Sequence, residues 1–395
     1  MPDIPNTHKN GDSLHVWSPM ANSSHERTTP RMPAAGRLES LTALRWFAAF
    51  VVFGKHAFSG GRLSHLVNQG VVGVSFFFIL SGFVLTWSYR DGDRTGAFYQ
   101  RRFARIYPAF LVSVAIGAIV NHGTVTPLHL LLVVTMLQDW SHNSAVYFSV
   151  SVVCWSLGCE AFFYLLFPFV IRPLRRLTPH RRRLLLVLVL AASLAVQLGI
   201  HSPSQNHGTG FWLMYIFPPV RFLEFVAGMI LALEVRDGTR LRISLRSAVA
   251  IAVAAYLAAG FVPIYAMWLA VTLLPFTLLI FTAATADVDG ARSWLRTPIL
   301  IKLGEISYCF YLLHQLILIA SGRLANWAGV PYSATKFAIP DLIVSVIAAY
   351  LLYRFVERPF ERRLRPGRPR SPGSQPIRAA GEDPPTVAEI PAGVA

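Results

Sequence analysis

GVVGVSFFFILSGFVLTWSY, residues 70–89, runs for twenty positions without a charged side chain. About 20 consecutive apolar residues are enough for one helix to cross the hydrocarbon core of a bilayer. Only 14% of the 395 residues are charged and 54% are hydrophobic, whereas roughly a quarter of the residues in a soluble domain are charged. The stretch therefore predicts an integral membrane protein.

Similar apolar runs recur on both sides of residues 70–89, so we predict an all-α, polytopic transmembrane helical bundle with one membrane domain over residues 38–360. The ten predicted spans are 38–56, 70–89, 106–121, 155–171, 184–200, 211–235, 244–262, 264–284, 299–320 and 339–357. A shorter apolar stretch, 127–137, is too short to cross and is predicted to be re-entrant or interfacial. The polar segment 1–37 and the Pro- and Arg-rich segment 361–395 are predicted to be disordered cytoplasmic tails.

Arginine is distributed unevenly among the connecting segments. Segments 90–105, 172–183 and 236–246 are rich in Arg, whereas 121–154 and 201–210 contain neither Lys nor Arg. Basic loops stay on the cytoplasmic side of a membrane. We therefore predict a multi-pass protein of a bacterial cytoplasmic membrane, with the Arg-rich segments and both termini in the cytoplasm.

The net charge of +16 has the same origin, so it predicts contact with the lipid bilayer and no nucleic-acid binding. Three cysteines, Cys154, Cys159 and Cys309, lie in or beside apolar spans without the spacing of metal ligands. We read them as small buried residues and expect no metal.

Several ionisable residues lie inside the predicted spans. Each charge near the middle of a membrane helix costs about 2.5–3.5 kcal/mol on insertion scales, so these groups should face a wet cavity or a partner. They are Arg45, Glu160, Arg221, Glu224, Lys302 and Glu305. As a group they predict a functional cavity, although a structural ion pair remains the alternative for each one.

Arg45 and His56 are eleven residues apart in the first span, which is three helical turns. They should lie on one stripe of that helix, roughly 16 Å apart along its axis. With the N-terminus inside, Arg45 lies towards the cytoplasm and His56 towards the outer end.

Seven motifs, in this order, are similar to those of the acyltransferase family 3 membrane proteins. They are LTALRWFAAFVVFGKHAF at 41–58, GVSFFFILSGFVL at 73–85, RRFARIYPAF at 101–110, WSLGCEAFFYLLFP at 155–168, RFLEFVAGM at 221–229, LGEISYCFYLLHQ at 303–315 and FVERPF at 355–360. The resemblance implies an O-acyltransferase that takes an acyl group, commonly acetyl, from acyl-coenzyme A. The acceptor it implies is a hydroxyl group of a carbohydrate, a glycolipid or envelope polymer, or a macrolide-type metabolite. The family's Arg and His map onto Arg45 and His56, and its basic motif onto Arg101, Arg102 and Arg105.

Transfer from a thioester to an alcohol needs a base that takes the hydroxyl proton, and an imidazole with a pKa of about 6.5 suits this role. We predict His56 as the base, with Arg45 and Glu160 as further catalytic residues. Glu160 could orient the His56 ring, or it could instead pair with Arg221. His314 is a second candidate for the base.

Arg101, Arg102 and Arg105 are predicted to bind the phosphates of coenzyme A, the alternative being topology or lipid contact. The cavity is predicted to include Arg221, Glu224, Glu305, Tyr308 and His314, with Tyr308 and Tyr311 more often typical of packing than of catalysis. A secondary transporter that uses buried charge pairs is the alternative function.

Overall fold

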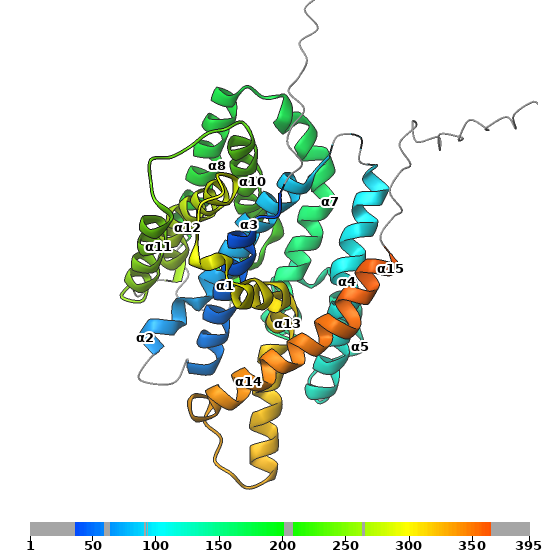
Figure 1. The fold of residues 1–395 in the computed structure, drawn as a ribbon. Helices are drawn as coiled ribbons and strands as arrows, with labels where there is room; N and C mark the ends of the chain where they lie inside the picture. The colour runs from blue at the N-terminus through cyan, green and yellow to red at the C-terminus, as the bar shows by residue number, and fades with distance from the viewer. Residues whose placement is uncertain are drawn as a thin grey trace, which may run out of the picture. The chain divides into compact units, whose positions relative to one another are not determined.

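The computed structural model describes residues 36–58, 64–90, 92, 94–200, 208–262 and 265–364, and all of their regular structure is helical (Figure 1). The long helices are α1 (Glu39–Phe58), α3 (Val72–Ser88), α4 (Thr95–Val120), α7 (Trp155–Arg176), α8 (Pro179–Gly199), α10 (Pro218–Arg236), α11 (Leu245–Ala259), α12 (Tyr265–Val288), α13 (Pro298–Trp327) and α14 (Ala334–Leu352). The short ones are α2 (Ser64–Val67), α5 (Pro127–Val134), α6 (Ser144–Tyr147), α9 (Gly208–Phe211) and α15 (Arg358–Arg363). The residues predicted to form the two tails, 1–37 and 361–395, fall mostly outside the described ranges.

Each of the ten predicted spans coincides with one of the ten long helices, which confirms the all-α polytopic bundle. Within the described residues, eight helical segments are long and apolar enough to cross a membrane. The two long helices that are not among these eight are α11 and α1. Helix α11 has only 15 residues, and the 20-residue helix α1 is made more polar by Arg45, Lys55 and His56.

The ends of the helices differ from the predicted span boundaries. Helix α4 starts at Thr95, well before the predicted residue 106, because its Arg-rich first half continues the same helix into the polar region. Arginine is a good helix former, so positive charge ends the apolar span without ending the helix. The stretch predicted at 127–137 forms the eight-residue helix α5, which is too short to cross a bilayer.

Helix α10 packs on α3 at two glycines, Gly82 and Gly228. A Cβ atom added to Gly82 would lie 1.9 Å from the Phe225 carbonyl oxygen, and one added to Gly228 would lie 1.8 Å from the Ile79 carbonyl oxygen. Small residues let membrane helices approach until their backbones touch, which sets their rotation and depth. This crossing therefore determines which face of α3 points towards α1 and α7.

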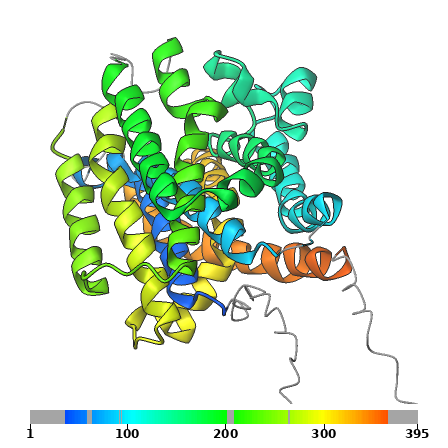
Figure 2. The same ribbon diagram turned by 90° about the horizontal axis from the view of Figure 1, so that it is seen from above.

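Helix α1 packs against both α13 and α3. Gly304 of α13 meets the Thr42 carbonyl oxygen of α1 at a second close crossing, where an added Cβ atom would lie 1.9 Å away. At the C-terminal end of the described chain, α15 crosses beside α4, as the two views show (Figure 2). Segments about 250 residues apart in sequence are thus brought beside the Arg-rich half of α4.

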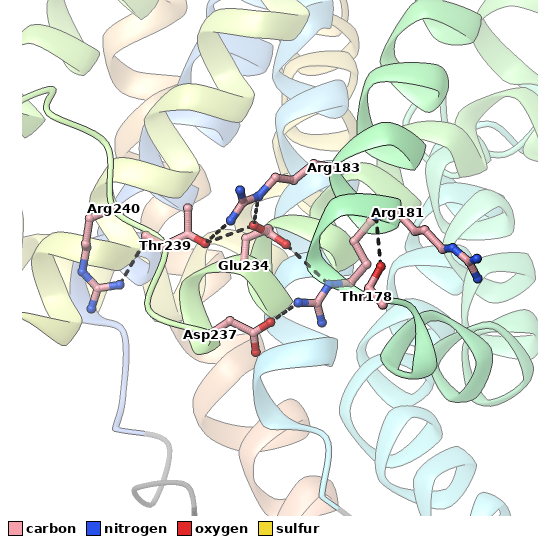
Figure 3. Close-up of polar contacts among 8 residues, drawn as sticks. Thr178, Arg181, Arg183, Glu234, Asp237, Thr239 and Arg240 are labelled. Atoms are coloured by element: carbon pink, nitrogen blue, oxygen red, sulfur yellow. Dashed lines mark hydrogen bonds and ion pairs between the residues drawn. The ribbon is translucent and has the colours of Figure 1, made fainter.

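A buried ionic cluster joins the start of α8 to the end of α10 (Figure 3). Glu234 is 3% exposed and accepts hydrogen bonds from Arg183 Nε at 2.8 Å and from the Thr239 hydroxyl at 3.0 Å. The buried Arg182 lies between Glu234, at 3.4 Å, and Asp237. Two Arg-rich segments are therefore held together at one end of the bundle, as expected if both face the same side of the membrane.

Replacing Glu234 by glutamine should lower the free energy of unfolding by about 1.5–3 kcal/mol, because it removes the buried carboxylate that accepts from Arg183 and leaves the buried Arg182 paired with the more exposed Asp237 alone. Thermal unfolding of the purified protein in detergent measures this. Asp289→Asn is the control, since Asp289 and its partner Arg240 are both partly exposed and such pairs contribute about 1 kcal/mol or less. Equal losses of stability in the two variants would contradict the structural role of the buried cluster.

Candidate functional site

A cavity of about 110 Å³ lies among α1, α3, α4, α7 and α13, and we call it the central cavity. Its α3 wall is largely apolar and includes Phe77, Phe78 and Leu80. The polar side chains that line it are Ser81 of α3 and, from the other four helices, Arg45, Arg102, Arg105, Ser156, Glu160, Tyr164, Tyr308 and Tyr311. Five separate helices therefore supply one polar site inside the bundle.

Three arginines and one carboxylate, Glu160, line this cavity, and a second carboxylate, Glu357, interacts with two of the arginines without lining it. Arg45 lies within electrostatic range of both Glu160 and Glu357. Arg105 also interacts with Glu357, which is 3% exposed and accepts a hydrogen bond from the Cys309 thiol at 3.1 Å. The acidic groups thereby offset part of the positive charge that the helices bring into the bundle.

Arg102 differs from this paired arrangement. Its Nε is buried and has no hydrogen-bond partner among the described residues, although its guanidinium lies 5.8 Å from the centre of the Phe98 ring. A buried guanidinium N–H without an acceptor is unfavourable unless a ligand or water supplies one. Arg102 is therefore suited to an anionic group that enters the cavity.

Hydroxyl groups connect the walls of the central cavity. Tyr164 donates a 2.9 Å hydrogen bond to Glu160 one turn earlier in α7, and its oxygen lies 3.3 Å from the Ser81 hydroxyl of α3. Across the cavity, the Ser156 and Tyr311 hydroxyls are 2.9 Å apart. Such a network holds the polar side chains in place and fixes the orientation of the Glu160 carboxylate.

His56 and His314 form a pair whose ring centroids are 5.4 Å apart. His314 is fully buried, and its Nδ1 lies 3.2 Å from the Phe310 carbonyl oxygen. A carbonyl can only accept, so Nδ1 carries the proton and Nε2, which has no partner within the described residues, is left as an acceptor. The Tyr311 ring lies 5.9 Å from the His314 ring and lines the central cavity, so it connects the histidine pair to that cavity.

The structure brings five of the predicted site residues together on the central cavity, namely Arg45, Arg102, Arg105, Glu160 and Tyr308. Glu160 lies on this cavity with Arg45, whereas the sequence suggested that it orients the His56 ring or pairs with Arg221. His56 pairs instead with His314. Arg101, next to Arg102 in α4, does not line the central cavity.

Arg221 and Glu224 form an ion pair of their own, 3.0 Å apart and each 1% exposed. Arg221 also donates to the Ser75 hydroxyl at 2.8 Å and lies over the Phe78 and Tyr215 rings. The pair does not line the central cavity, but Arg221 contacts Phe78, which does. Arg221 therefore pairs with Glu224 and not with Glu160.

Glu305 lies elsewhere, near the start of α13. It pairs with Arg37 and with Lys302, whose Nζ is 3.2 Å from the Glu305 carboxylate. Neither Glu305 nor Lys302 lines the central cavity.

Sequence reasoning did not select Tyr164, Ser156 or Glu357 as site residues. Tyr164 follows Glu160 by four residues, so the helical spacing alone places it on the same face of α7. Glu357 stands at the end of the last span in the FVERPF motif, where a terminal charge is usually read as solvent-exposed. Its contact with Arg105 depends on how the C-terminal helices cross α4, which no local pattern reveals.

The profile of the acyltransferase domain family matches residues 38–356. The chain is 34% identical over 384 residues to the acyltransferase MdmB of Streptomyces mycarofaciens, covering 89% of this chain and 98% of that protein. It is 28% identical over 317 residues to the exopolysaccharide production protein ExoZ of Rhizobium meliloti, covering 76% and 93%. Identity to the O-acetyltransferase OatA of Staphylococcus aureus is 23% over 366 residues, covering 83% of this chain and 59% of that protein. No solved structure matches.

Proposed function

The chain belongs to the acyltransferase family defined by this domain, and on that premise we propose that it moves an acyl group, such as acetyl, from acyl-coenzyme A to a hydroxyl group of a carbohydrate, glycolipid or macrolide-type metabolite. Family membership makes the protein a multi-pass O-acyltransferase, and it sets aside the alternative of a secondary transporter. The names of ExoZ and OatA, which refer to exopolysaccharide production and O-acetyl transfer, favour sugar hydroxyls as acceptors and acetyl as the acyl group.

The observation that carries this proposal is the convergence of Arg45, Arg102, Arg105 and Glu160 on one cavity beside the histidine pair. Arginine binds phosphate through two parallel N–H groups, and Arg102 has a buried N–H to offer. Arg101 and Arg105 supply further positive charge on the same helix. The arginine side of the cavity is accordingly the donor side.

In the proposed reaction, the oxygen of the acceptor hydroxyl attacks the thioester carbonyl carbon while His56 takes the hydroxyl proton. The carbon–sulfur bond then breaks, and the proton on His56 passes to the departing thiolate, which leaves coenzyme A as a free thiol. His314 presents Nε2 as an acceptor, so it can receive an N–H from the His56 ring and leave the other His56 nitrogen with its lone pair for the acceptor hydroxyl. His314 is thus a positioning residue for the base.

The acceptor is proposed to approach from the side of the histidine pair, opposite the donor. Gln315, next to His314, accepts hydrogen bonds from the Ser151 hydroxyl and the Val152 backbone N–H, both at 3.2 Å. Residues 121–154 contain no Lys or Arg, which is typical of an external loop. Donor and acceptor would then meet inside the bundle from opposite faces of the membrane.

Changing His56 to alanine should lower the rate of acyl transfer by about 10²–10⁴-fold, because a positioned general base contributes a factor of this size. The measurement follows radiolabelled acetyl from acetyl-coenzyme A into hydroxyl-bearing products in membranes that contain equal amounts of each variant. His180→Ala is the control, since His180 is exposed at the start of α8. Retention of most of the activity in the His56 variant would rule out this residue as the base.

Arg102→Ala should raise the KM for acetyl-coenzyme A by about tenfold or more, since a hydrogen bond to a charged group contributes roughly 1.5–3 kcal/mol. The kcat at saturating donor should change much less. Arg246→Ala removes the same charge from an exposed position in another Arg-rich segment and should leave the KM unaltered. Identical donor kinetics for both variants would assign Arg102 to topology or lipid contact.

Orientation can be tested with single introduced cysteines, because the three native thiols are buried and burial raises the pKa of Cys154 to about 12. A membrane-impermeant maleimide added to intact cells should label His142→Cys and leave Arg176→Cys unlabelled until the membrane is opened. Both positions are exposed on the protein, so access to the reagent alone separates them. External labelling of Arg176→Cys would overturn the proposed orientation.

A further inference from the structure

A second cavity of about 240 Å³ lies between α4 and α7, next to the central cavity, and we call it the lateral cavity. Its own walls are Tyr99, Phe103 and Tyr107 of α4, Ala161 and Leu165 of α7, and Met136 from the segment that follows α5. These side chains are almost entirely apolar where they face the cavity. None of the residues assigned above to the histidine pair or to the Arg221–Glu224 ion pair lines it.

Two tyrosines of α4 connect the walls of the lateral cavity. The Tyr99 hydroxyl donates to the Leu165 carbonyl oxygen of α7 at 2.9 Å, and the Tyr107 hydroxyl donates to the Val134 carbonyl oxygen of α5 at 3.1 Å. Eight residues separate the two tyrosines, so these bonds lie about 12 Å apart along α4. The two hydrogen bonds hold α4 to α7 and to α5 near the two ends of the lateral cavity.

Met136, on the wall of the lateral cavity, has a strained backbone conformation. It is the one non-glycine residue with a positive φ, 57°, in the described part of the chain. The Leu137 N–H bonds to the Leu132 carbonyl and the Met136 N–H to the Val133 carbonyl, which is the Schellman ending that usually places glycine at this position. The left-handed conformation costs a residue with a Cβ atom about 1–2 kcal/mol. Glycine at position 136 would avoid this cost, but it would not supply a side chain to the cavity wall.

The lateral and central cavities share five wall residues. Arg102, Glu160 and Tyr164 are the polar part of this common wall, and Ile106 and Leu157 are the apolar part. A molecule that crosses from one cavity to the other would leave its polar end beside Glu160 and carry only hydrocarbon into the lateral cavity. A sugar would find few hydrogen-bond partners there, so the acceptor does not suit this space.

We propose that the lateral cavity binds the alkyl part of the donor's acyl group, so that the protein accepts acyl chains longer than acetyl, with Met136 and Ala161 limiting their length. The proposal rests on the proposed use of acyl-coenzyme A as donor. It assigns the choice of acyl group to the α4–α7 wall, away from the histidines.

Each methylene buried in such a cavity contributes about 0.8 kcal/mol, which is roughly a fourfold gain in affinity. The dissociation constant of the purified protein should therefore fall about fourfold per added methylene from acetyl- to butanoyl-coenzyme A, until the cavity is full. Equilibrium binding of acetyl-, butanoyl-, hexanoyl- and octanoyl-coenzyme A measures this without any knowledge of the acceptor.

Ala161→Phe fills the lateral cavity from α7. It should change the affinity for acetyl-coenzyme A by no more than about twofold. It should lower the affinity for butanoyl- and hexanoyl-coenzyme A about tenfold or more, which corresponds to the loss of about two buried methylene groups. Met136→Gly should act in the opposite direction, extending the chain length at which affinity stops rising, while the thermal stability of the protein stays the same or increases. Ala115→Phe, at an exposed site of α4 outside both cavities, is the matched control for lipid and detergent effects.

The outcomes separate this proposal from the function on which it rests. If coenzyme A and all its esters fail to bind, the donor assignment is wrong and the proposal falls with it. If the donors bind but Ala161→Phe and Ala115→Phe have the same chain-length dependence, the lateral cavity does not hold the acyl chain.

Discussion

The charge of Arg45 in the first half of helix α1 is the constraint on which the rest of the site depends. A guanidinium there cannot face hydrocarbon at a cost of several kcal/mol, so α1 must turn this side chain towards the bundle interior. Glu160 of α7 and Glu357, beyond α14, supply the compensating charges. The positions of α7 and of the C-terminal helices around α1 therefore depend on one buried cation, and the polar cavity is formed where they meet.

Two kinds of buried charge can be distinguished in this protein. Arg182 of α8 pairs with Glu234 of α10 and joins these two helices, whereas Arg221 and Glu224 pair within α10 and reach α3 through the Ser75 hydroxyl. The charges of the central cavity are arranged more loosely, and Arg102 keeps an unpartnered N–H. Among the described residues, Arg182 and Arg221 also keep an unpartnered Nε, but neither residue lines the central cavity, whereas Arg102 does and can gain by binding an anion there.

The separation between the arginine cluster and the histidine pair fits a reaction with two substrates of different character. The arginines suit the phosphates of a thioester donor, while the histidines lie beside a loop without basic residues. Tyr311 contacts both regions. Its hydroxyl is hydrogen-bonded to Ser156 at the central cavity, and its ring lies beside the His314 ring. The reacting carbon would accordingly lie near Tyr311, between the two regions.

The amino-acid sequence by itself determined that the protein is a helical membrane bundle, where its spans lie, and which residue types are out of place in them. These are local properties, since a run of apolar residues forms a membrane helix wherever it is inserted and an ionisable residue in it needs a partner. The motifs likewise pointed to Arg45, Arg102, Arg105 and Glu160 before their convergence was visible. What the sequence could not decide was which partner each charge finds. Glu160 meets Arg45, and Arg221 meets Glu224, because close glycine crossings such as that of Gly82 and Gly228 set the depth and rotation of each helix. Hydrophobic periodicity carries no information about such crossings in a bundle surrounded by lipid, so Glu357 and the lateral cavity emerge only from the tertiary structure.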